Sequence, residues 1–347
     1  MKPHIKRKLL PSFLVLFLLG CCLFRPASAT AEGPRIVLIP PDARPGDPVT
    51  VAYSDTFGAQ GAGPRNLEAV LVDSKGRRIE KALFFNLPLP ESAASEGTEA
   101  SEGAAVSEGT AATGERKFRA AILAVPTTAV SGNAVIRVES ADGVIQDLPF
   151  VIDSREFTSE TIPLDQENTD LRVKPDPEKT AESEQLWAIL SRTGTEIYAG
   201  GPFTPPVSST RRTSFYGDRR IYEYNDGTED TTIHAGIDYG VPKGTEVRAC
   251  ARGKVVLAKL RIVTGNTVIL EHLPGLYSLY YHMDKIAVSQ GAIVEAGTLL
   301  GLSGSTGLAT GPHLHWEIRV STEFADPDAF LARPVLDKTD IFNKLTN

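Results

Sequence analysis

The segment "TGLATGPHLHWEIRV" (residues 306–320) places two of the chain's six histidines, His313 and His315, one residue apart. Its second half is typical of a β-strand, in which side chains at positions i and i+2 lie on the same face. The two imidazoles therefore share one face of the expected strand, and Leu314 points the other way, into the core. Such a pair is either a metal ligand beside a catalytic neighbour or two solvated polar side chains, and the rest of the chain has to decide.

The other histidines are not scattered evenly along the chain. Five of the six lie between residues 234 and 315, and these five are His234, His272, His282, His313 and His315. An acidic residue, Asp238, follows the first of them by four positions, in "HAGIDYG". A catalytic zinc usually has three protein ligands and leaves its fourth position to water. Two imidazoles and one carboxylate form such a set, so the pattern favours a metal site.

The remaining imidazoles have a role beside such a metal. His282 ends the strand-like run "YSLYYH", and His313 shares a face with His315. Neutral imidazoles next to a metal can act as general bases and can stabilise an oxyanion. We expect His272, which precedes a Pro-Gly turn, to pack or cap instead. Glu317 is expected to be a hydrogen-bonding partner near the site and not the base.

Three motifs in this order resemble one protein family. "HAGID" at residues 234–238, "YYHM" at 280–283 and "GPHLHWE" at 311–317 resemble the lysostaphin-like (LytM-type, M23) zinc metallopeptidases, and "TSFYGDRR" at 213–220 is similar to the segment that precedes their first ligand. The resemblance covers residues 205–330 or so. It implies that His234, Asp238 and His315 bind one Zn²⁺ per catalytic domain and that His282 and His313 are the catalytic histidines.

The resemblance also implies a substrate and leaves an alternative. Members of this family cleave peptide bonds in the stems or crosslinks of peptidoglycan, so peptidoglycan peptides are the expected substrate. Some members have lost ligands and instead bind and activate other cell-wall hydrolases, which makes a catalytically latent regulator the alternative. Because the complete set of ligands and catalytic histidines is present here, the sequence favours the enzyme.

The N-terminal residues indicate export. A basic stretch, "MKPHIKRK", precedes an apolar run and small residues before Ala29, so residues 1–29 are predicted to be a signal peptide. "LLGC" is the competing interpretation, a lipobox that would attach the chain to a membrane through lipidated Cys21. Either route leads to the periplasm or cell envelope. The formal net charge of −7 gives no basic footprint, so no nucleic-acid partner is expected.

Two domains and a connector are expected between the signal and the C-terminus. Residues 34–153 contain short Val- and Ile-rich runs separated by turn residues, which predict an immunoglobulin-like β-sandwich that contacts a cell-envelope partner. Its Ser-Glu-Gly repeats predict a disordered insertion at about 91–115. Residues 154–200 are a connector, residues 201–333 an antiparallel β-sheet domain with a groove, and residues 334–347 a tail. The fold class is therefore all-β.

The connector contains a predicted helix at about residues 177–193. Asp176 is the expected N-cap and Gly194 the expected C-terminal stop. Leu186, Trp187 and Leu190 recur at helical spacing and predict an apolar face that packs on one of the domains. A helix that occludes the active site is the alternative. Nearby, Arg211, Arg212, Arg219 and Arg220 either form a solvated loop or contact substrate carboxylates.

Overall fold

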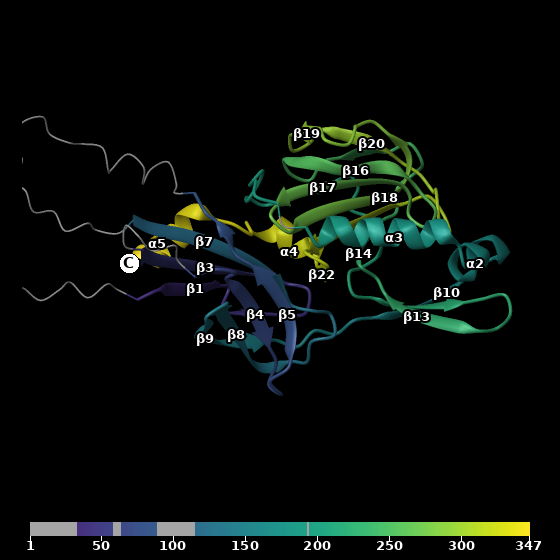
Figure 1. Cartoon of the computed structure of the whole chain (residues 1–347). Coiled ribbons are helices and arrows are strands. Elements are labelled where there is room, and N and C mark those ends of the chain that lie inside the picture. Colours follow the sequence, from purple (N-terminus) through teal and green to yellow (C-terminus); the bar gives the residue numbers. More distant parts are fainter. Residues whose placement is uncertain (1–32, 58–63, 89–114, 193) are drawn as a thin grey trace, which may run out of the picture. The chain divides into compact units, whose positions relative to one another are not determined.

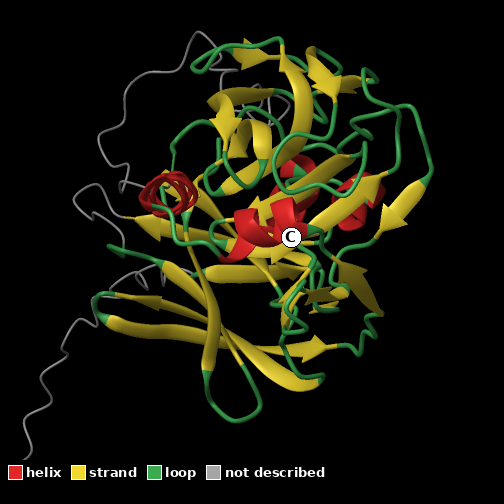
Figure 2. Cartoon of the chain, turned by 90° about the vertical axis from the view of Figure 1, so that its right-hand side faces the viewer, coloured by secondary structure: helices red, strands yellow, loops and turns green. Residues whose placement is uncertain are grey.

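Strands predominate over helices in the described part of the chain, as Figure 2 shows. The computed structural model describes residues 33–57, 64–88, 115–192 and 194–347. The predicted signal peptide lies outside these residues, as does nearly all of the predicted insertion at 91–115. The prediction of an all-β chain with a C-terminal antiparallel sheet is confirmed. None of the helices in the described ranges combines the length and the apolar character needed to span a bilayer.

The N-terminal part contains two sheets. The first has the strand order β1 (Arg35–Ile39), β3 (Pro48–Phe57), β7 (Glu115–Ala124) and β6 (Phe85–Asn86). The second has the order β2 (Asp42–Ala43), β9 (Gly143–Ile152), β8 (Gly132–Ser140), β4 (Glu68–Val72) and β5 (Arg78–Leu83). Alternate residues of both sheets, including Val51, Leu71 and Ile136, share one buried core. An immunoglobulin-like connectivity stays a prediction.

The C-terminal part is built on a large sheet whose strand pairs are all antiparallel. Its main path runs through β11 (Arg212–Ser214), β14 (Gly236–Tyr239), β21 (Leu314–Val320), β18 (Leu276–Ile286), β17 (Gly265–Leu273), β16 (Gly253–Arg261) and β19 (Ile293–Val294). Three short strands join it at the sides: β15 (Glu246–Arg248), β20 (Leu299–Ser303) and β22 (Glu323–Ala325). The sheet thus places β21 between β14 and β18, and these three strands carry the predicted site residues His315, Asp238 and His282 respectively.

The connector has more structure than the sequence indicated. Its strand β10 (Ser159–Pro163) pairs in parallel with β12 (Arg219–Glu223), which in turn pairs with β13 (Glu229–Ile233). A short helix, α2 (Gln166–Val173), follows β10, and the Asp165 side chain accepts a hydrogen bond from the Asn168 backbone N–H at its start. This three-stranded sheet leads directly into the segment that carries His234. The connector therefore packs with the segment that carries His234.

Helix α3 (Pro177–Leu190) packs on the large sheet. As predicted, Asp176 caps its start, accepting a hydrogen bond from the Glu178 N–H at 2.7 Å. The helix ends at Leu190, so the prediction that Gly194 stops it was wrong. Figure 1 shows α3 beside β18. Leu190 is buried against Leu257, Tyr277 and other residues of β16, β17 and β18.

Trp187 does not belong to the buried face of α3, contrary to the prediction. Its side chain is 61% exposed, whereas Leu186 and Leu190 contact the sheet. Successive helical residues point about 100° apart, so the i, i+4 pair Leu186 and Leu190 shares a face that Trp187 leaves. The spacing of these three apolar residues was therefore not enough to predict which face of α3 packs against the sheet.

The last residues form structure where a tail was expected. Helix α4 (Pro327–Ala332) follows β22, and helix α5 (Lys338–Thr346) packs near β1 and β3. Ile341 and Leu345 of α5 are buried in the hydrophobic cluster that also contains residues of the large sheet. The segment 334–347 is therefore a packed element.

Candidate active site

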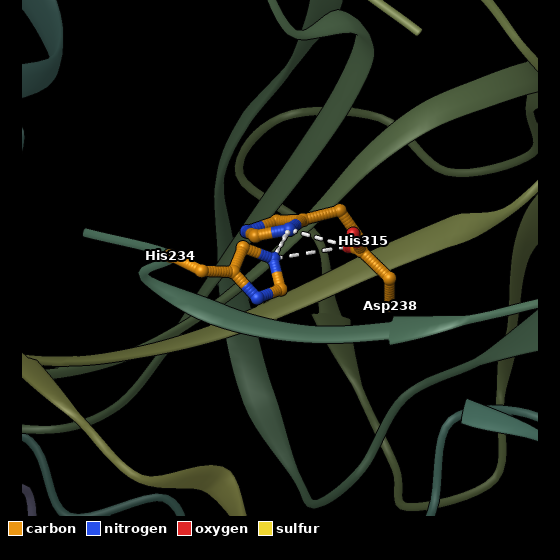
Figure 3. A group of neighbouring side chains, drawn as sticks. All are labelled: His234, Asp238 and His315. Atoms are coloured by element: carbon orange, nitrogen blue, oxygen red, sulfur yellow. Dashed lines mark hydrogen bonds and ion pairs between the residues drawn. The ribbon is translucent and has the colours of Figure 1, made fainter. Parts of the chain in front are cut away.

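Three side chains that the sequence singled out converge at one point. The candidate ligand atoms of His234, Asp238 and His315 all lie within 4.8 Å of one another, and all three residues are buried (Figure 3). His234 Nε2 lies 3.0 Å from His315 Nδ1, and Asp238 Oδ1 lies 3.2 Å from His234 Nε2 and 2.8 Å from His315 Nδ1. Within the described residues this is the one group of three or more His, Cys, Asp or Glu side chains arranged to hold a metal.

Strand pairing accounts for this convergence. Asp238 on β14 is the direct cross-strand partner of His315 on β21, and such partners have adjacent Cβ atoms. The glycine of "HAGID" permits the close approach of the two strands, because a Cβ at Gly236 would lie 2.2 Å from the carbonyl oxygen of Trp316. His234 arrives from the short link between β13 and β14. In the motif H-x-x-x-D, His234 therefore lies in a turn and Asp238 in the strand that follows, and both side chains face His315.

Neighbouring acceptors determine which nitrogen of each imidazole faces the cluster. His234 Nδ1 lies 2.7 Å from the carbonyl oxygen of Phe215, so this nitrogen carries the proton and donates it. His315 Nε2 lies 3.4 Å from Glu317 Oε2, which favours a proton on that nitrogen. The opposite nitrogens, His234 Nε2 and His315 Nδ1, then point lone pairs toward one another and toward Asp238. This is the arrangement in which an outer carboxylate or carbonyl orients a metal-binding histidine.

The donor set fits a zinc ion. Two imidazole lone pairs and a carboxylate oxygen facing one another repel without a cation between them, and two nitrogens with one oxygen are the ligands of many catalytic zinc sites. Burial disfavours charge on His315, but hydrogen bonds to Asp238 and Glu317 outweigh it and raise its pKa to about 9, so without a cation Nδ1 binds a proton that a zinc ion at this position would replace. Although burial opposes charge on Asp238, hydrogen bonds from both histidines hold the pKa of its carboxyl well below the usual range. Asp238 is therefore ionised and available as a ligand.

The two predicted catalytic histidines lie beside this cluster. The ring centroids of His282 and His313 are 4.8 Å apart, and His313 Nε2 lies 3.9 Å from Asp238 Oδ1. His282 Nδ1 donates to the Thr306 carbonyl and His313 Nδ1 to the Gly311 carbonyl, each at 2.8 Å. Both rings therefore keep an unprotonated Nε2. All five residues chosen from the sequence are thus brought together.

His282 has an unusual backbone. Its φ angle of +59° lies in the left-handed region that non-glycine residues seldom adopt, and such conformations concentrate at functional sites. The ring is buried, and burial together with the nearby His313 lowers its pKa to about 3. His282 is consequently neutral at physiological pH.

Arg220 is a neighbour of the cluster that the sequence left undecided. Its guanidinium donates hydrogen bonds to Asp238 Oδ2 and, at 3.0 Å, to Glu160 Oε1 of β10. Arg212 pairs with Asp328 through two hydrogen bonds of 2.6 and 2.7 Å. Arg211 donates to the Gly240 carbonyl, and Arg219 to that of Gly217. All four arginines of the two doublets therefore have partners within the chain.

A groove of about 190 Å³ opens over the cluster. Among its lining residues are Arg172, Arg220, Tyr222, His234, His282 and His315. Arg172 comes from helix α2 of the connector, and the sequence analysis missed it because nothing near it in the chain marks it as a site residue. Tyr281, the cross-strand neighbour of His315, stacks on that ring with centroids 5.2 Å apart.

His272 has no part in the cluster. It is fully buried, and its Nδ1 donates to the Arg252 carbonyl at 2.8 Å while Nε2 accepts from the Ser278 hydroxyl at 2.8 Å. Its role is packing and hydrogen bonding, as the sequence indicated.

Comparison with known proteins identifies the domain. Residues 232–327 match the model of peptidase family M23, and this range contains all five site residues. The chain carries an M23 peptidase domain. The M23 match does not include β10, α2 or β12, so Arg172 and Arg220 lie outside it.

Relatives of the M23 domain include two groups of named enzymes. The chain is 36% identical over 142 residues to DD-carboxypeptidase/endopeptidase Mpg of Neisseria meningitidis, an alignment that covers 41% of this chain and 32% of Mpg. It is 37% identical over 116 residues to peptidoglycan DD-endopeptidase ShyA of Vibrio cholerae, covering 33% of this chain and 26% of ShyA. The chain thus spans about a third or less of the length of these relatives.

One solved structure aligns with most of this chain. A protein from Pseudomonas aeruginosa described as a peptidase M23 is 22% identical, with a TM-score of 0.48, and the match covers 82% of this chain and 94% of that one.

Proposed function

We propose that this protein is an exported, zinc-dependent metalloendopeptidase that hydrolyses peptide bonds in peptidoglycan stems or crosslinks. The observation that carries the proposal is the convergence of His234, Asp238 and His315 beside the unprotonated Nε2 atoms of His282 and His313. The M23 match and the peptidoglycan endopeptidase named ShyA support a peptidoglycan substrate. The predicted signal at residues 1–29 supports export to the cell envelope.

Zinc would be held by His234 Nε2, Asp238 and His315 Nδ1, where it supplies Lewis acidity that acidifies water and polarises a peptide carbonyl. The chain's own groups then handle the protons. His313 Nε2 accepts a proton from the attacking water, and Asp238 at 3.9 Å stabilises the resulting imidazolium. The charged His313 can return this proton to the leaving amine. Glu317 and the Phe215 carbonyl hold the two imidazole ligands in orientation.

His282 lies where it can assist the same steps. Its low pKa keeps the ring neutral with Nε2 unprotonated, so His282 is expected to accept a hydrogen bond from the attacking water and orient it. The charged His313 is the group that can hydrogen-bond the tetrahedral oxygen anion. Arg220 fixes the carboxylate of Asp238 through its second oxygen. Nothing in this scheme requires residues of the N-terminal sheets, which we propose position the enzyme in the envelope.

The test uses zinc-loaded protein, purified peptidoglycan and mass spectrometry of the released termini. The wild-type protein should produce new peptide termini, and His313→Ala should keep its zinc while losing activity by about 10²- to 10⁴-fold. His315→Ala should lose both zinc and activity. Glu246→Gln on β15, at an exposed ion pair with Arg248, is the matched surface change.

Two outcomes would contradict the proposal. Equal products from the wild-type protein and His313→Ala would exclude this histidine as the base. Tight zinc binding without cleavage, together with stimulation of a second cell-wall hydrolase, would favour the latent regulator instead.

A further inference from the structure

Arg172 lines the same groove as the metal cluster although it lies outside the M23 match. It belongs to α2, about sixty residues before His234, and reaches the groove because β10 adds to the edge of β12. The backbone N–H of Leu164, just before α2, donates to the Glu223 carbonyl at 2.9 Å, which fastens the connector to that sheet. The connector therefore contributes a wall of the groove.

The guanidinium of Arg172 is held in one orientation. Nε donates to the Tyr224 hydroxyl at 2.8 Å and Nη2 to Asp230 Oδ2 at 2.6 Å. Its carbon Cζ lies 4.2 Å from the centroid of the Tyr222 ring, which also lines the groove. Nη1 makes no hydrogen bond within the described residues, so one amino group of a fixed planar cation remains available. A cation ordered in advance loses little entropy when it binds an anion.

The two arginines of the groove differ in how far their charge is neutralised. Arg220 donates to two carboxylates, those of the buried Asp238 and of Glu160, whose side chain is 36% exposed. Arg172 has one carboxylate partner, Asp230, whose side chain is 51% exposed to solvent. Water screens such a pair, so Asp230 neutralises Arg172 incompletely. Arg172 is consequently the cation of the groove that is best able to bind a further anion.

The size of the groove indicates which part of a bound peptide would lie next to Arg172. At about 190 Å³, the space has the volume of roughly one large residue. A peptide bond held over His234 and His315 therefore places the adjoining residue beside Arg172. A carboxylate on that residue would meet a charge-assisted hydrogen-bond donor, the strongest kind available to a peptide.

We propose that Arg172 forms a subsite for a free carboxylate on the substrate residue next to the cleaved bond. The inference rests on the proposed function, since it assumes that a peptide occupies the groove. The carboxylate is either a chain terminus or an acidic side chain, which share the same chemistry. Arg172 is then a specificity-determining residue that the connector supplies to the M23 domain.

The experiment measures binding and turnover separately. Crosslinked muropeptide dimers are prepared in three forms: unmodified, amidated at the chain termini, and amidated at the side-chain carboxylates. Binding is measured by calorimetry on the zinc-loaded full chain carrying His313→Ala, which prevents turnover. Cleavage of the same three forms is measured on the chain with His313 intact.

Arg172→Gln should weaken binding of the unmodified dimer by about 10- to 100-fold and raise KM similarly, with little change in kcat. The substitution should have no effect on binding of the amidated dimer that lacks the recognised carboxylate. Whichever amidated dimer this is shows whether Arg172 recognises a chain terminus or a side-chain carboxylate. Arg172→Lys should restore part of the affinity, and Asp230→Asn, which removes the competing carboxylate, should tighten binding. Lys174→Gln, an exposed change just after the same helix, should leave all values unchanged.

Outcomes that overturn the inference are distinct from a failure of the proposed function. Equal loss for all three dimers, or a loss of zinc or of folding stability that accounts for the effect, would make Arg172 a structural residue only. Unchanged binding in Arg172→Gln, or no binding when Arg172 is intact, would overturn the subsite. Selective binding by a wild-type protein that does not cleave would refute the peptidase and leave the subsite standing.

Discussion

At the scale of single residues, the site depends on which nitrogen of each imidazole carries a proton. Phe215 and Glu317 direct those protons away from the cluster, so that lone pairs converge on the metal position. The Glu317 carboxylate is itself fixed by Arg319, which donates a hydrogen bond to its other oxygen. Glu317 and, behind it, Arg319 thus orient His315.

Replacing Glu317 by Gln should weaken zinc binding by about 10- to 100-fold, because the outer carboxylate orients the ligand and raises its basicity. The measurement is a competition titration with a chromophoric chelator. Glu246→Gln, a change at an exposed ion pair with Arg248, is the control and should bind zinc normally. Unaltered affinity in Glu317→Gln would show that His315 needs no such partner.

The buried His272 makes stability depend on pH. Burial lowers its pKa to about 4, whereas the unfolded chain titrates near 6.5. Between these values the unfolded state binds a proton that the folded state excludes. The stabilisation is therefore complete above about pH 6.5 and is lost as the pH falls toward 4.

Urea unfolding with chelator present, at pH 7.5 and 4.5, measures this effect. The wild-type protein should lose about 2 to 3 kcal/mol more between the two pH values than His272→Gln, which cannot take up the proton. Identical pH dependence of the two proteins would mean that His272 is solvated or already charged in the folded state.

At the scale of elements, α3 covers part of the sheet face that carries Tyr281. Leu190 and Leu186 pack against β16 to β18, and the buried Glu182 accepts a hydrogen bond from the Ile262 N–H at 2.9 Å. Tyr281 belongs to the cluster that α3 covers, and its ring stacks on His315. The helix therefore packs against the part of the sheet that holds Tyr281 next to the candidate ligand His315.

Leu190→Ala should lower the free energy of unfolding by about 2 to 5 kcal/mol, the cost of deleting a buried leucine side chain. Chemical denaturation followed by intrinsic fluorescence provides the measurement. Trp187→Ala, three residues away on the exposed side of α3, should change stability by less than about 0.5 kcal/mol; circular dichroism is used there because a fluorophore is lost. A small effect of Leu190→Ala would place α3 loosely on the sheet.

At the scale of the whole molecule, the C-terminal segment is joined to the N-terminal sheets. The Thr50 hydroxyl of β3 donates to the Val335 carbonyl at 2.6 Å, and helix α5 contacts β1 and β3. Arg155, just after the second N-terminal sheet, pairs with the buried Asp326 at the start of α4 at 2.6 Å. Segments from both ends of the described chain thus share contacts.

Leu345→Ala should destabilise the protein by about 2 to 5 kcal/mol, although Leu345 is two residues from the end of the chain, because its side chain is fully buried. Thermal unfolding by calorimetry measures the loss. Asn343→Ala, an exposed change on the same helix, is the control. Equal stability of the two variants would mean that residues 334–347 form a tail, as the sequence analysis expected.

The sequence by itself determined the candidate catalytic residues. The ordered motifs that resemble the M23 family single out His234, Asp238, His282, His313 and His315, and the period of two in a strand predicts that His313 and His315 share a face. The residues Asp176 and Pro177 likewise predict the N-cap of α3. The all-β class followed from short runs of β-branched residues between turns.

Only the tertiary structure decided what surrounds those residues. Arg172 meets Asp230 and Arg220 meets Glu160 across about sixty residues of chain, and no local pattern records such a pairing. Trp187 and Gly194 were misassigned for a related reason: burial and helix ends depend on the surface that the helix packs against. His234 and Asp238 are close in the sequence, whereas His315 and the walls of the groove reach them through contacts between distant segments.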